Sequence, residues 1–255
     1  MPGRQTMQQT KPQIASDATL QTRVLAQMRA DIVACDLLPN QRLTLQALRK
    51  RYGAGFSPIR EALMGLAAEG LVRLEQNKGF RVASVSRDSL YDLMEARIEI
   101  ENVALRWSIE NGGVEWEADL IAAFHRLSRH SKLQRGHPGA ISGDWSKEHR
   151  AFHHALVAAC NSQTMLAIRE NLFDKAERYV ALSIVSKAPS RNDAAEHEQI
   201  IEAALARNAT RALAANREHI ERTANKVAKS LEKHPEFSRP LEWSPTRDSR
   251  MSLAG

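Results

Sequence analysis

The feature that most limits the fold of this chain is a change in the spacing of its apolar residues. Between Leu71 and Ala83 the pattern fits two short strands around a polar turn, which runs from Glu75 to Gly79. Before this segment, and again after Asp88, apolar residues recur every three or four positions, which is the period of an amphipathic helix. Helices, one hairpin and then helices alone predict a mainly α protein.

Three predicted helices precede the hairpin. The first runs from Leu20 and ends before Pro39, because the residue before a proline is pushed out of the helical region. The second follows Thr44, which can serve as its N-cap. The third has Ser57 as its N-cap and Gly70 at its left-handed C-terminal end. Three helices followed by a hairpin predict a winged helix-turn-helix.

The rest of the chain predicts a separate helical bundle. Six helical patterns follow the hairpin, near residues 88–110, 115–133, 144–160, 163–186, 191–207 and 209–232. We therefore expect a flexible arm (1–18), a winged helix-turn-helix domain (19–86), an all-α six-helix ligand-binding domain (87–232) and a disordered tail (233–255).

Charge divides the chain in the same way. Residues 1–86 hold twelve Lys and Arg against six Asp and Glu, a net charge of +6. The remaining 24 basic and 24 acidic residues cancel. A basic part beside a neutral part predicts that the first binds a polyanion such as DNA and that the second has another task.

The apolar runs, the N-terminus and the cysteines indicate in which compartment the protein works. The apolar runs are too short for a membrane span, and the polar N-terminus lacks the apolar core of a signal peptide. Cys35 and Cys160 both lie in apolar helical patterns and are too few for a disulfide framework. We expect two buried, reduced thiols in a cytoplasmic protein, associated with the nucleoid when it is bound to DNA.

The reading helix of a helix-turn-helix lies in the major groove, with its N-terminal residues at the base edges. In this chain Arg60 lies one turn into that helix, opposite its apolar side, where a guanidinium can bind guanine. The alternative is that Arg60 only pairs with Glu61 or Glu69. We predict DNA contacts from Gln46, Arg49, Lys50, Phe56, Ser57, Pro58, Arg60, Gln76, Asn77, Lys78 and Gly79.

Four histidines form a candidate metal site. His149 and His153 are four residues apart and share one helical face, while His197 and His219 lie on the last two predicted helices. Four imidazoles that meet inside a bundle would bind Zn²⁺ or Ni²⁺. The alternative, which is the more common one for a lone His-x-x-x-His, is a set of ordinary core or surface histidines.

Arg97 and Glu101 are candidate effector-binding residues. An arginine is always charged and binds a carboxylate through two parallel hydrogen bonds, so Arg97 could anchor an anionic effector. The alternative is a pair with Glu101 one helical turn away, worth only a few tenths of a kcal/mol.

The N-terminal residues also resemble a known signature, carried by Leu38-Pro39, Leu43, Leu48, Tyr52-Gly53, Pro58-Ile59-Arg60-Glu61-Ala62-Leu63, Leu66, Glu69-Gly70-Leu71-Val72, Gly79 and Val82. This combination resembles the GntR family of bacterial regulators. The family usually has Ser-Arg after the turn, whereas this chain has Gly55-Phe56. The change removes one customary DNA-contacting arginine and leaves room for a different operator.

The resemblance extends over most of residues 90–222. Arg97, Ile100 and Glu101 fit the Arg-x-x-Leu-Glu pattern that opens the sensor of the FadR-like, FCD-type branch. Within that branch the chain is similar to regulators of the carbon-starvation-induced type, through Tyr52, the segment 78–84, Gly112-Gly113 and the segment 115–119.

The resemblance implies a repressor that releases DNA when a small carboxylate binds, and for the carbon-starvation type a dicarboxylate such as glutarate. It also implies a metal held by Asp-x-x-x-His and two later histidines, with the effector carboxylate on the metal. His153, His197 and His219 match these positions, and Phe152 precedes the first of them. His149 stands where the aspartate is usual, which leaves the identity of the metal open.

Two other function classes compete with a regulator. A metal-dependent enzyme is disfavoured, because the segment 149–153 lacks the glutamate of His-Glu-x-x-His and no Glu-x-x-His pair is present. A winged-helix adaptor that binds protein is disfavoured by the basic first part. We expect a homodimer on a pseudo-palindromic operator, with the sensor domains in contact.

Overall fold

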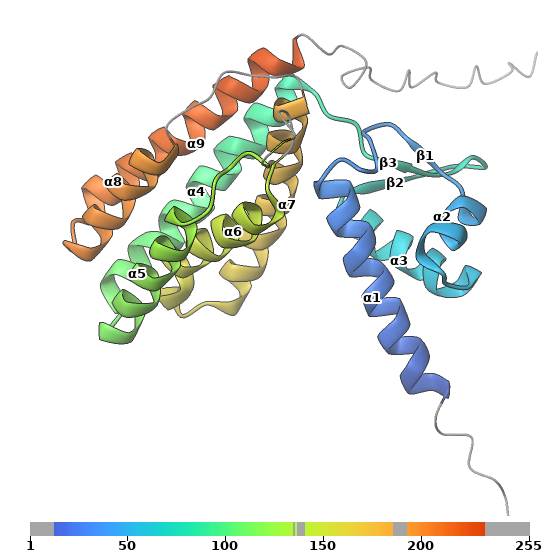
Figure 1. The fold of residues 1–255 in the computed structure, drawn as a ribbon, viewed down its shortest axis with the longest axis horizontal. Coiled ribbons are helices and arrows are strands. Elements are labelled where there is room, and N and C mark those ends of the chain that lie inside the picture. The colour runs from blue at the N-terminus through green and yellow to red at the C-terminus, as the bar shows by residue number, and fades with distance from the viewer. Residues whose placement is uncertain (1–12, 135, 137–140, 186–192, 233–255) are drawn as a thin grey trace, which may run out of the picture.

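The computed structural model describes residues 13–134, 136, 141–185 and 193–232. Within these residues nine α-helices, one short 3-10 helix and a three-stranded sheet form two groups of elements that are joined by the segment after β3 (Figure 1). A winged helix-turn-helix precedes an all-α group, so the predicted mainly α fold is confirmed. Residues 1–12 of the expected arm and the expected tail lie outside the described residues.

The first group carries a compact apolar core. Its elements are α1 (Gln13–Val33), β1 (Arg42–Leu43), α2 (Leu45–Tyr52), α3 (Phe56–Ala68), β2 (Val72–Glu75) and β3 (Gly79–Val82). Met28 of α1, Leu48 of α2 and Leu63 of α3 are buried in one cluster with Phe80 of the hairpin. The helix α1 begins at Gln13, before Leu20 where the apolar pattern starts, so residues 13–18 of the expected arm are helical.

The sheet holds a strand that the sequence pattern does not predict. The hairpin pairs Val72 with Val82 and Leu74 with Phe80, and β1 adds to the other edge of β3 through Leu43 and Phe80. The order is β1-β3-β2, antiparallel throughout. Two residues are too few to show the alternation that marks a strand, so β1 has no signal of its own.

The start of α3 corrects the predicted cap. The helix begins at Phe56, its N-cap is Gly55, and Ser57 donates from its hydroxyl to Glu61 instead of capping. Thr44 caps α2 as predicted, accepting from the backbone N–H of Ala47 at 3.3 Å. Gly70 has φ +76° and continues the chain into β2 in the left-handed conformation that glycine favours.

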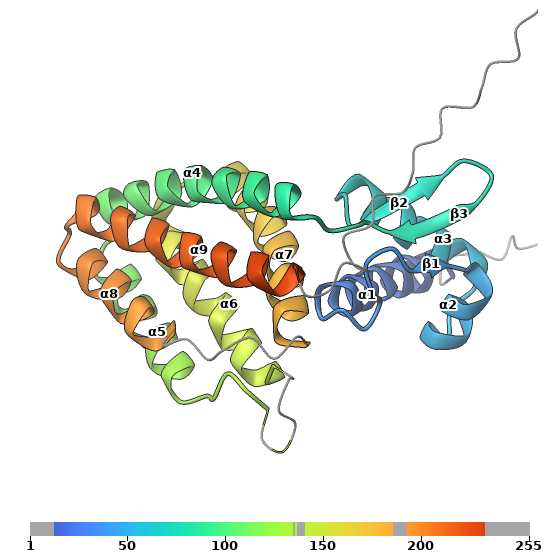
Figure 2. The same ribbon diagram turned by 90° about the horizontal axis from the view of Figure 1, so that it is seen from above.

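The second group is a helical bundle, seen from above in Figure 2. Its elements are α4 (Arg87–Asn111), α5 (Val114–Ser128), α6 (Gly143–Val157), the 3-10 helix η1 (Ala158–Cys160), α7 (Gln163–Val185), α8 (Asp193–Leu205) and α9 (Ala209–Leu231). The six predicted helices are all present, although α5 ends at Ser128 rather than 133. The bundle has two apolar clusters, one around Leu120 and Phe152 and one around Met94 and Ile220.

The two groups are in direct contact. Helix α1 packs against α7, and Cys35 and Val85 are buried in the same cluster as residues of α4, α7 and α9. Arg178 of α7 donates a hydrogen bond to the carbonyl of Ala83, just after β3. The Cys35 thiol lies 3.5 Å from the carbonyl oxygen of Arg178. Helix α7 is therefore the element of the bundle that the winged domain contacts most directly.

Both cysteines are reduced and buried, as predicted. Burial raises the pKa of Cys35 to about 12. None of the helices in the described ranges combines the length and the apolar composition that a membrane span requires.

Candidate functional site

The predicted DNA-reading helix has one buried side and one exposed side. Ile59, Leu63 and Leu66 of α3 are in the core, whereas Phe56, Ser57 and Arg60 point to solvent. The alternative, that Arg60 pairs with Glu61 or Glu69, is not observed. Glu61 instead accepts from Ser57, and Glu69 pairs with Arg29 at 2.5 Å. Within the described part of the chain Arg60 makes no ion pair, and its guanidinium is available to a ligand.

The wing and α3 form one hollow. It measures about 540 Å³ and is lined by Arg60 and Met64 of α3, Lys78 and Asn77 of the wing turn, and Arg42 of β1, among others. Gln76, Asn77, Lys78 and Gly79 are all exposed. Three cations on one concave surface suit a phosphate backbone. Arg42 was missed by the sequence patterns, because its strand carries no signal.

The departure at Gly55-Phe56 leaves an aromatic side chain at the tip of the reading helix. Phe56 is 53% exposed, which is unusual for phenylalanine. The guanidinium carbon of Arg49 lies 4.1 Å from the centre of its ring. Gln46, Arg49 and Lys50 of α2 are exposed beside it, so the apolar tip is surrounded by polar and basic groups.

The four predicted histidines meet inside the bundle. His149 and His153 come from α6, His197 from α8 and His219 from α9. All four are buried, and one nitrogen from each lies within 4.8 Å of one from every other. The spacing of four residues explains the first pair; the packing of α8 and α9 against the bundle supplies the other two.

Burial keeps the imidazoles of His149 and His153 neutral. It lowers the pKa of His149 and His153 well below the ordinary value, and the neighbouring histidines and Arg97 add to the effect. A neutral imidazole has a lone pair and can ligate a metal. His219 Nδ1 lies 2.9 Å from Glu196 Oε2, and a neutral His219 that donates from Nδ1 to this carboxylate has its lone pair on Nε2.

The residues fit a metal. Both ring nitrogens of His153 are buried without a hydrogen-bond partner, as is Nδ1 of His149. Buried polar atoms in native proteins are nearly always paired, and an ion is one of the partners that can satisfy them. Glu196 behind His219 supplies the outer carboxylate that fixes the orientation of a ligating histidine in metal sites.

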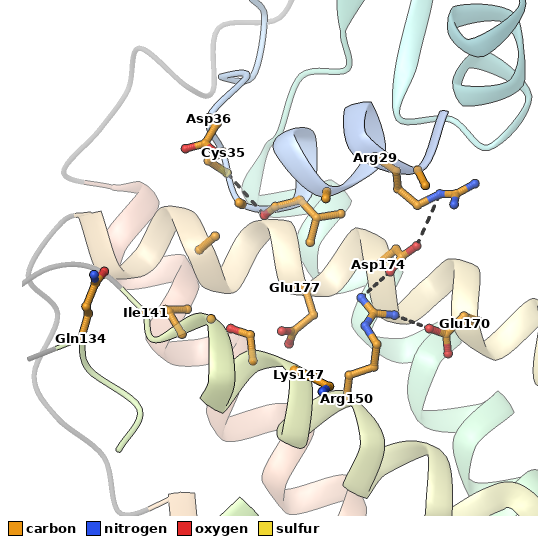
Figure 3. Close-up of a pocket in the computed structure, with 17 residues that line it drawn as sticks. Arg29, Cys35, Asp36, Gln134, Ile141, Lys147, Arg150, Glu170, Asp174 and Glu177 are labelled. Carbon is orange, nitrogen blue, oxygen red and sulfur yellow. Dashed lines mark hydrogen bonds and ion pairs between the residues drawn. The ribbon is translucent and has the colours of Figure 1, made fainter. Parts of the chain in front are cut away.

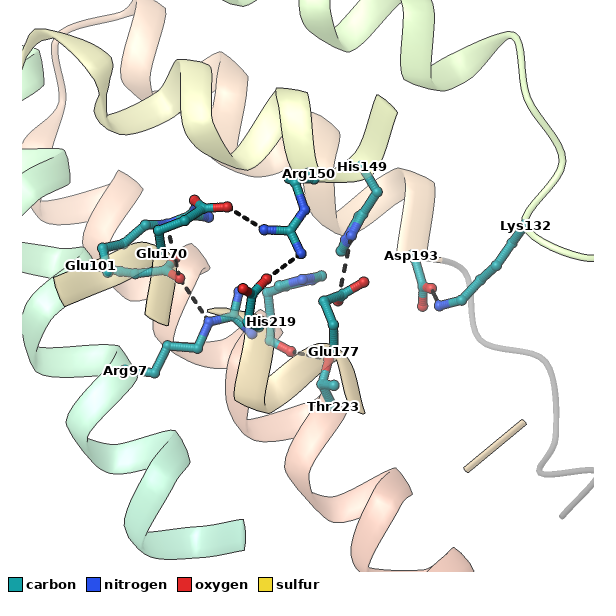
Figure 4. A network of polar contacts seen from close by, with 12 residues as sticks. Arg97, Glu101, Lys132, His149, Arg150, Glu170, Glu177, Asp193, His219 and Thr223 are labelled. Atoms are coloured by element: carbon teal, nitrogen blue, oxygen red, sulfur yellow. Dashed lines mark hydrogen bonds and ion pairs between the residues drawn. The ribbon is translucent and has the colours of Figure 1, made fainter. Parts of the chain in front are cut away.

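Acidic and basic side chains surround the histidines (Figure 4). Glu177 Oε1 lies 3.7 Å from His149 Nδ1, and burial raises the pKa of Glu177. Trp145 stacks on His149 with ring centres 4.4 Å apart. Arg97 and Glu101 form the expected pair on α4 at 2.7 Å, and both are almost fully buried. The pair thus lies in the interior beside the histidines. The energy of a few tenths of a kcal/mol that is typical of an exposed pair on a helix does not apply to it.

A pocket joins this region to the winged domain (Figure 3). It measures about 790 Å³ and lies between α1, α6 and α7, with Arg29, Arg150, Asp174 and Glu177 among its lining residues. Arg150, the residue after His149, pairs with Asp174 at 2.5 Å and with Glu170. The pocket therefore reaches from the reading domain to the side of the histidine cluster.

Comparison with known proteins agrees with these observations. Residues 20–82 match the family described as bacterial regulatory proteins, gntR family, and residues 92–222 match the FCD domain. The HTH-type transcriptional repressor GlaR of Escherichia coli (strain K12) is 36% identical over 197 residues, which cover 76% of this chain and 89% of GlaR. The regulator BphR of Paraburkholderia xenovorans (strain LB400) is 36% identical over 214 residues, which cover 84% of this chain and 87% of BphR.

Solved structures support the fold. E. coli McbR/YncC superimposes with a TM-score of 0.71 at 18% identity, covering 83% of this chain and 98% of that one. The family models and relatives are transcription regulators, which excludes the enzyme reading. The chain therefore belongs to the GntR family of bacterial regulatory proteins, as a DNA-binding transcription regulator with an FCD effector domain.

Proposed function

We propose that the protein is a homodimeric repressor of a catabolic operon, released from DNA when a small dicarboxylate binds beside a metal held by His149, His153, His197 and His219. The observation that carries this proposal is the convergence of four buried histidines, of which His153 has no hydrogen-bond partner among the described residues. Two of the relatives are repressors by name, GlaR and the gluconate operon repressor of Bacillus licheniformis. Because bacterial operator DNA lies in the cytoplasm, we expect such a regulator to work there.

The donor set favours Zn²⁺ or Ni²⁺, because imidazole suits these ions. His149 in place of the usual aspartate makes the site one negative charge poorer. When bound, the metal would supply a Lewis acid that attracts an effector carboxylate. Burial holds the imidazoles of His149 and His153 neutral for this task, and Glu196 orients His219.

Helix α7 is suited to carry the signal, because its side chains alternate between the two domains. Phe173 and Glu177 face the histidine cluster, with Phe173 5.7 Å from the ring centre of His153. Asp174 and Arg178, each one residue further on, face α1 and the carbonyl of Ala83. A shift of α7 on effector binding would therefore move the reading domain through both contacts.

For release, the effector must bind the DNA-free arrangement more tightly than the DNA-bound one, since equal affinity shifts nothing. A homodimer would place two reading helices one turn of DNA apart on a pseudo-palindromic operator. Val103 and Trp107 of α4 are exposed and lie four residues apart on one helical face, which offers an apolar contact between two sensors.

Metal analysis of the purified full-length protein, followed by binding to an operator selected from a random duplex library, tests the proposal. Stoichiometric Zn²⁺ or Ni²⁺, and a C4–C6 dicarboxylate that raises the Tm and releases the DNA, are the expected results. Protein that has no metal, takes up none and keeps its DNA in every diacid would contradict it. A weak dependence of DNA affinity on salt would instead favour the adaptor reading.

A further inference from the structure

Arg169 of α7 is fully buried and only partly paired. None of its surface is exposed. Its Nη1 donates to Glu170 at 3.1 Å, but Nε and Nη2 are buried without a hydrogen-bond partner. Arginine is almost never buried unless its charge is matched, because an unsatisfied guanidinium in the interior is costly. Nε and Nη2 together carry three N–H groups, and none of them has a hydrogen-bond acceptor among the residues that the structure describes.

A second buried arginine also has a nitrogen without a hydrogen bond. Arg97 donates from Nε to Glu101 at 2.7 Å, while its Nη2 is also buried and unpartnered. Arg169 Nε lies 3.5 Å from the same Glu101 oxygen. Two buried guanidinium groups thus face one buried carboxylate, with Glu170 half-exposed at the edge. Burial lowers the pKa of Arg169, Glu101 opposes this shift, and the charge of Arg97 adds to it.

The two arginines and the histidines lie around one aromatic ring. The guanidinium carbons of Arg97 and Arg169 are 4.7 and 4.3 Å from the centre of Phe173. The rings of His149 and His153 are centred 5.9 and 5.7 Å from the same point. Phe173 is itself fully buried. A ligand that touches this phenyl ring could reach the imidazoles at one end and the guanidinium groups at the other.

We infer that Arg97 and Arg169 form a subsite for the second carboxylate of a short dicarboxylate whose first carboxylate binds at the histidine cluster. The inference rests on the proposed function, because it takes the histidine cluster as the first anchor. A carboxylate has two oxygens and about four acceptor positions, enough to accept from the three nitrogens that lack a hydrogen bond among the described residues. Binding would also balance the excess positive charge, so the subsite selects diacids over monoacids.

Calorimetry on the full-length, zinc-supplemented protein tests this with matched ligands. Glutarate and pentanoate have the same five carbons and differ by one carboxylate, and succinate with butanoate and adipate with hexanoate extend the series. We expect the best diacid to bind about 10- to 100-fold more tightly than its matched monoacid, the range expected for hydrogen bonds to a charged group. Equal affinity for diacid and monoacid would overturn the subsite and leave a carboxylate-binding metal site standing. Binding of neither class would overturn the proposed function as well.

The variant Arg169→Gln assigns the selectivity to its residue. It should lower the affinity for the diacid about 10-fold or more and leave the monoacid unchanged. The matched control is Arg150→Gln, whose guanidinium also lies over Phe173 at 4.9 Å but is already paired with Glu170 and Asp174; it should keep the diacid-to-monoacid ratio. An Arg169→Gln protein that binds zinc and retains the wild-type ratio would overturn the inference. Should that variant fail to fold, the wild-type ratio and Arg97→Gln decide it.

Discussion

Arg29 of α1 lies 3.8 Å from Asp174 of α7 and thereby connects the reading domain to the sensor (Figure 3). Arg29 also binds Glu69, the C-cap of α3, through two hydrogen bonds. Asp174 in turn binds Arg150, the residue next to His149. The chain of contacts Glu69, Arg29, Asp174, Arg150 thus runs from the end of the reading helix to the helix that carries two of the histidines.

Replacing Asp174 with asparagine should weaken the response to effector more than the binding of DNA. A partly exposed ion pair contributes about 0.2–1 kcal/mol, so the ratio of operator affinities without and with effector should fall by roughly 1.4- to fivefold. Titration of operator DNA with and without diacid measures this ratio. Glu232→Gln, which removes the exposed pair with Arg87, is the control and should not change it. An unchanged ratio in Asp174→Asn would remove this contact from the signal path.

The same variant predicts a pH dependence of stability. Burial raises the pKa of Asp174 above its ordinary 3.8, so the folded protein holds this proton at pH values where the unfolded chain has lost it. Because the folded state binds more protons than the unfolded state over this range, the free energy of unfolding falls as pH rises from about 4 through the raised pKa. Denaturant unfolding of Asp174→Asn should therefore gain stability relative to the wild type as pH rises to neutrality. A relative loss over this range would show that the pairs with Arg29 and Arg150 outweigh burial.

Arg60→Ala should reduce operator affinity while leaving effector binding intact. The side chain is exposed, has no partner within the described chain and lines the hollow between α3 and the wing. Loss of one base-contacting arginine costs about 1–3 kcal/mol, which is roughly 5- to 150-fold in Kd. Fluorescence anisotropy with operator DNA measures this at fixed salt. Arg129→Ala, an exposed arginine at the end of α5, should retain normal affinity; normal affinity in Arg60→Ala would show that another element reads the DNA.

Phe56 should contact a thymine methyl group. Its exposed ring stands at the first position of α3 and is apolar where the family usually has arginine. Apolar side chains in the major groove contact the C5-methyl group of thymine. Replacing each operator thymine with deoxyuridine removes only that methyl group, and at one position we expect a loss of about 0.8 kcal/mol, roughly fourfold. The loss should vanish in Phe56→Ala; a uracil effect of the same size in this variant would assign the contact to another residue.

Removal of the metal should destabilise the sensor. A ligand at 100 times its Kd stabilises the folded state by about 2.7 kcal/mol, and for a chain of this size that is a fall in Tm of roughly 5–10 °C on chelation. Differential scanning calorimetry with and without chelator measures it. The double variant His153→Ala/His197→Ala should have a low Tm that the chelator does not change, and His149→Asp should still bind metal. A Tm of the wild type that the chelator leaves unchanged would contradict a structural role for the ion.

The sequence predicted most of the fold because its apolar spacing is regular. The six helices of the sensor and the wing hairpin follow from that spacing. The two-residue strand β1 did not, because it exists only through its pairing with β3. The cap of α3 was misplaced by two residues: Ser57 is a good capping residue by type, but its hydroxyl binds Glu61 and the backbone of Gly55 takes the cap position.

Only part of the candidate site could be predicted from the sequence. His149 and His153 share a helical face by spacing alone, whereas the positions of His197 and His219 depend on how α8 and α9 pack. Arg169 was overlooked, although a signal exists: it lies three residues after Leu166 and four before Phe173, so it occupies the apolar face of α7. An arginine at a core position is unusual, and only the structure shows that two of its nitrogens lack a hydrogen bond.

The stacking of Trp145 on His149 gives the sensor an optical readout of its own. The two rings are nearly parallel, with 16° between their planes, and the Lys132 ammonium lies 4.6 Å from the indole on α6. An ion on His149 would therefore sit within a few ångströms of an intrinsic fluorophore. A paramagnetic ion such as Ni²⁺ would quench its emission, whereas closed-shell Zn²⁺ would not. The unlabelled protein can thus report which metal it holds, and when an effector disturbs that metal, in its own emission spectrum.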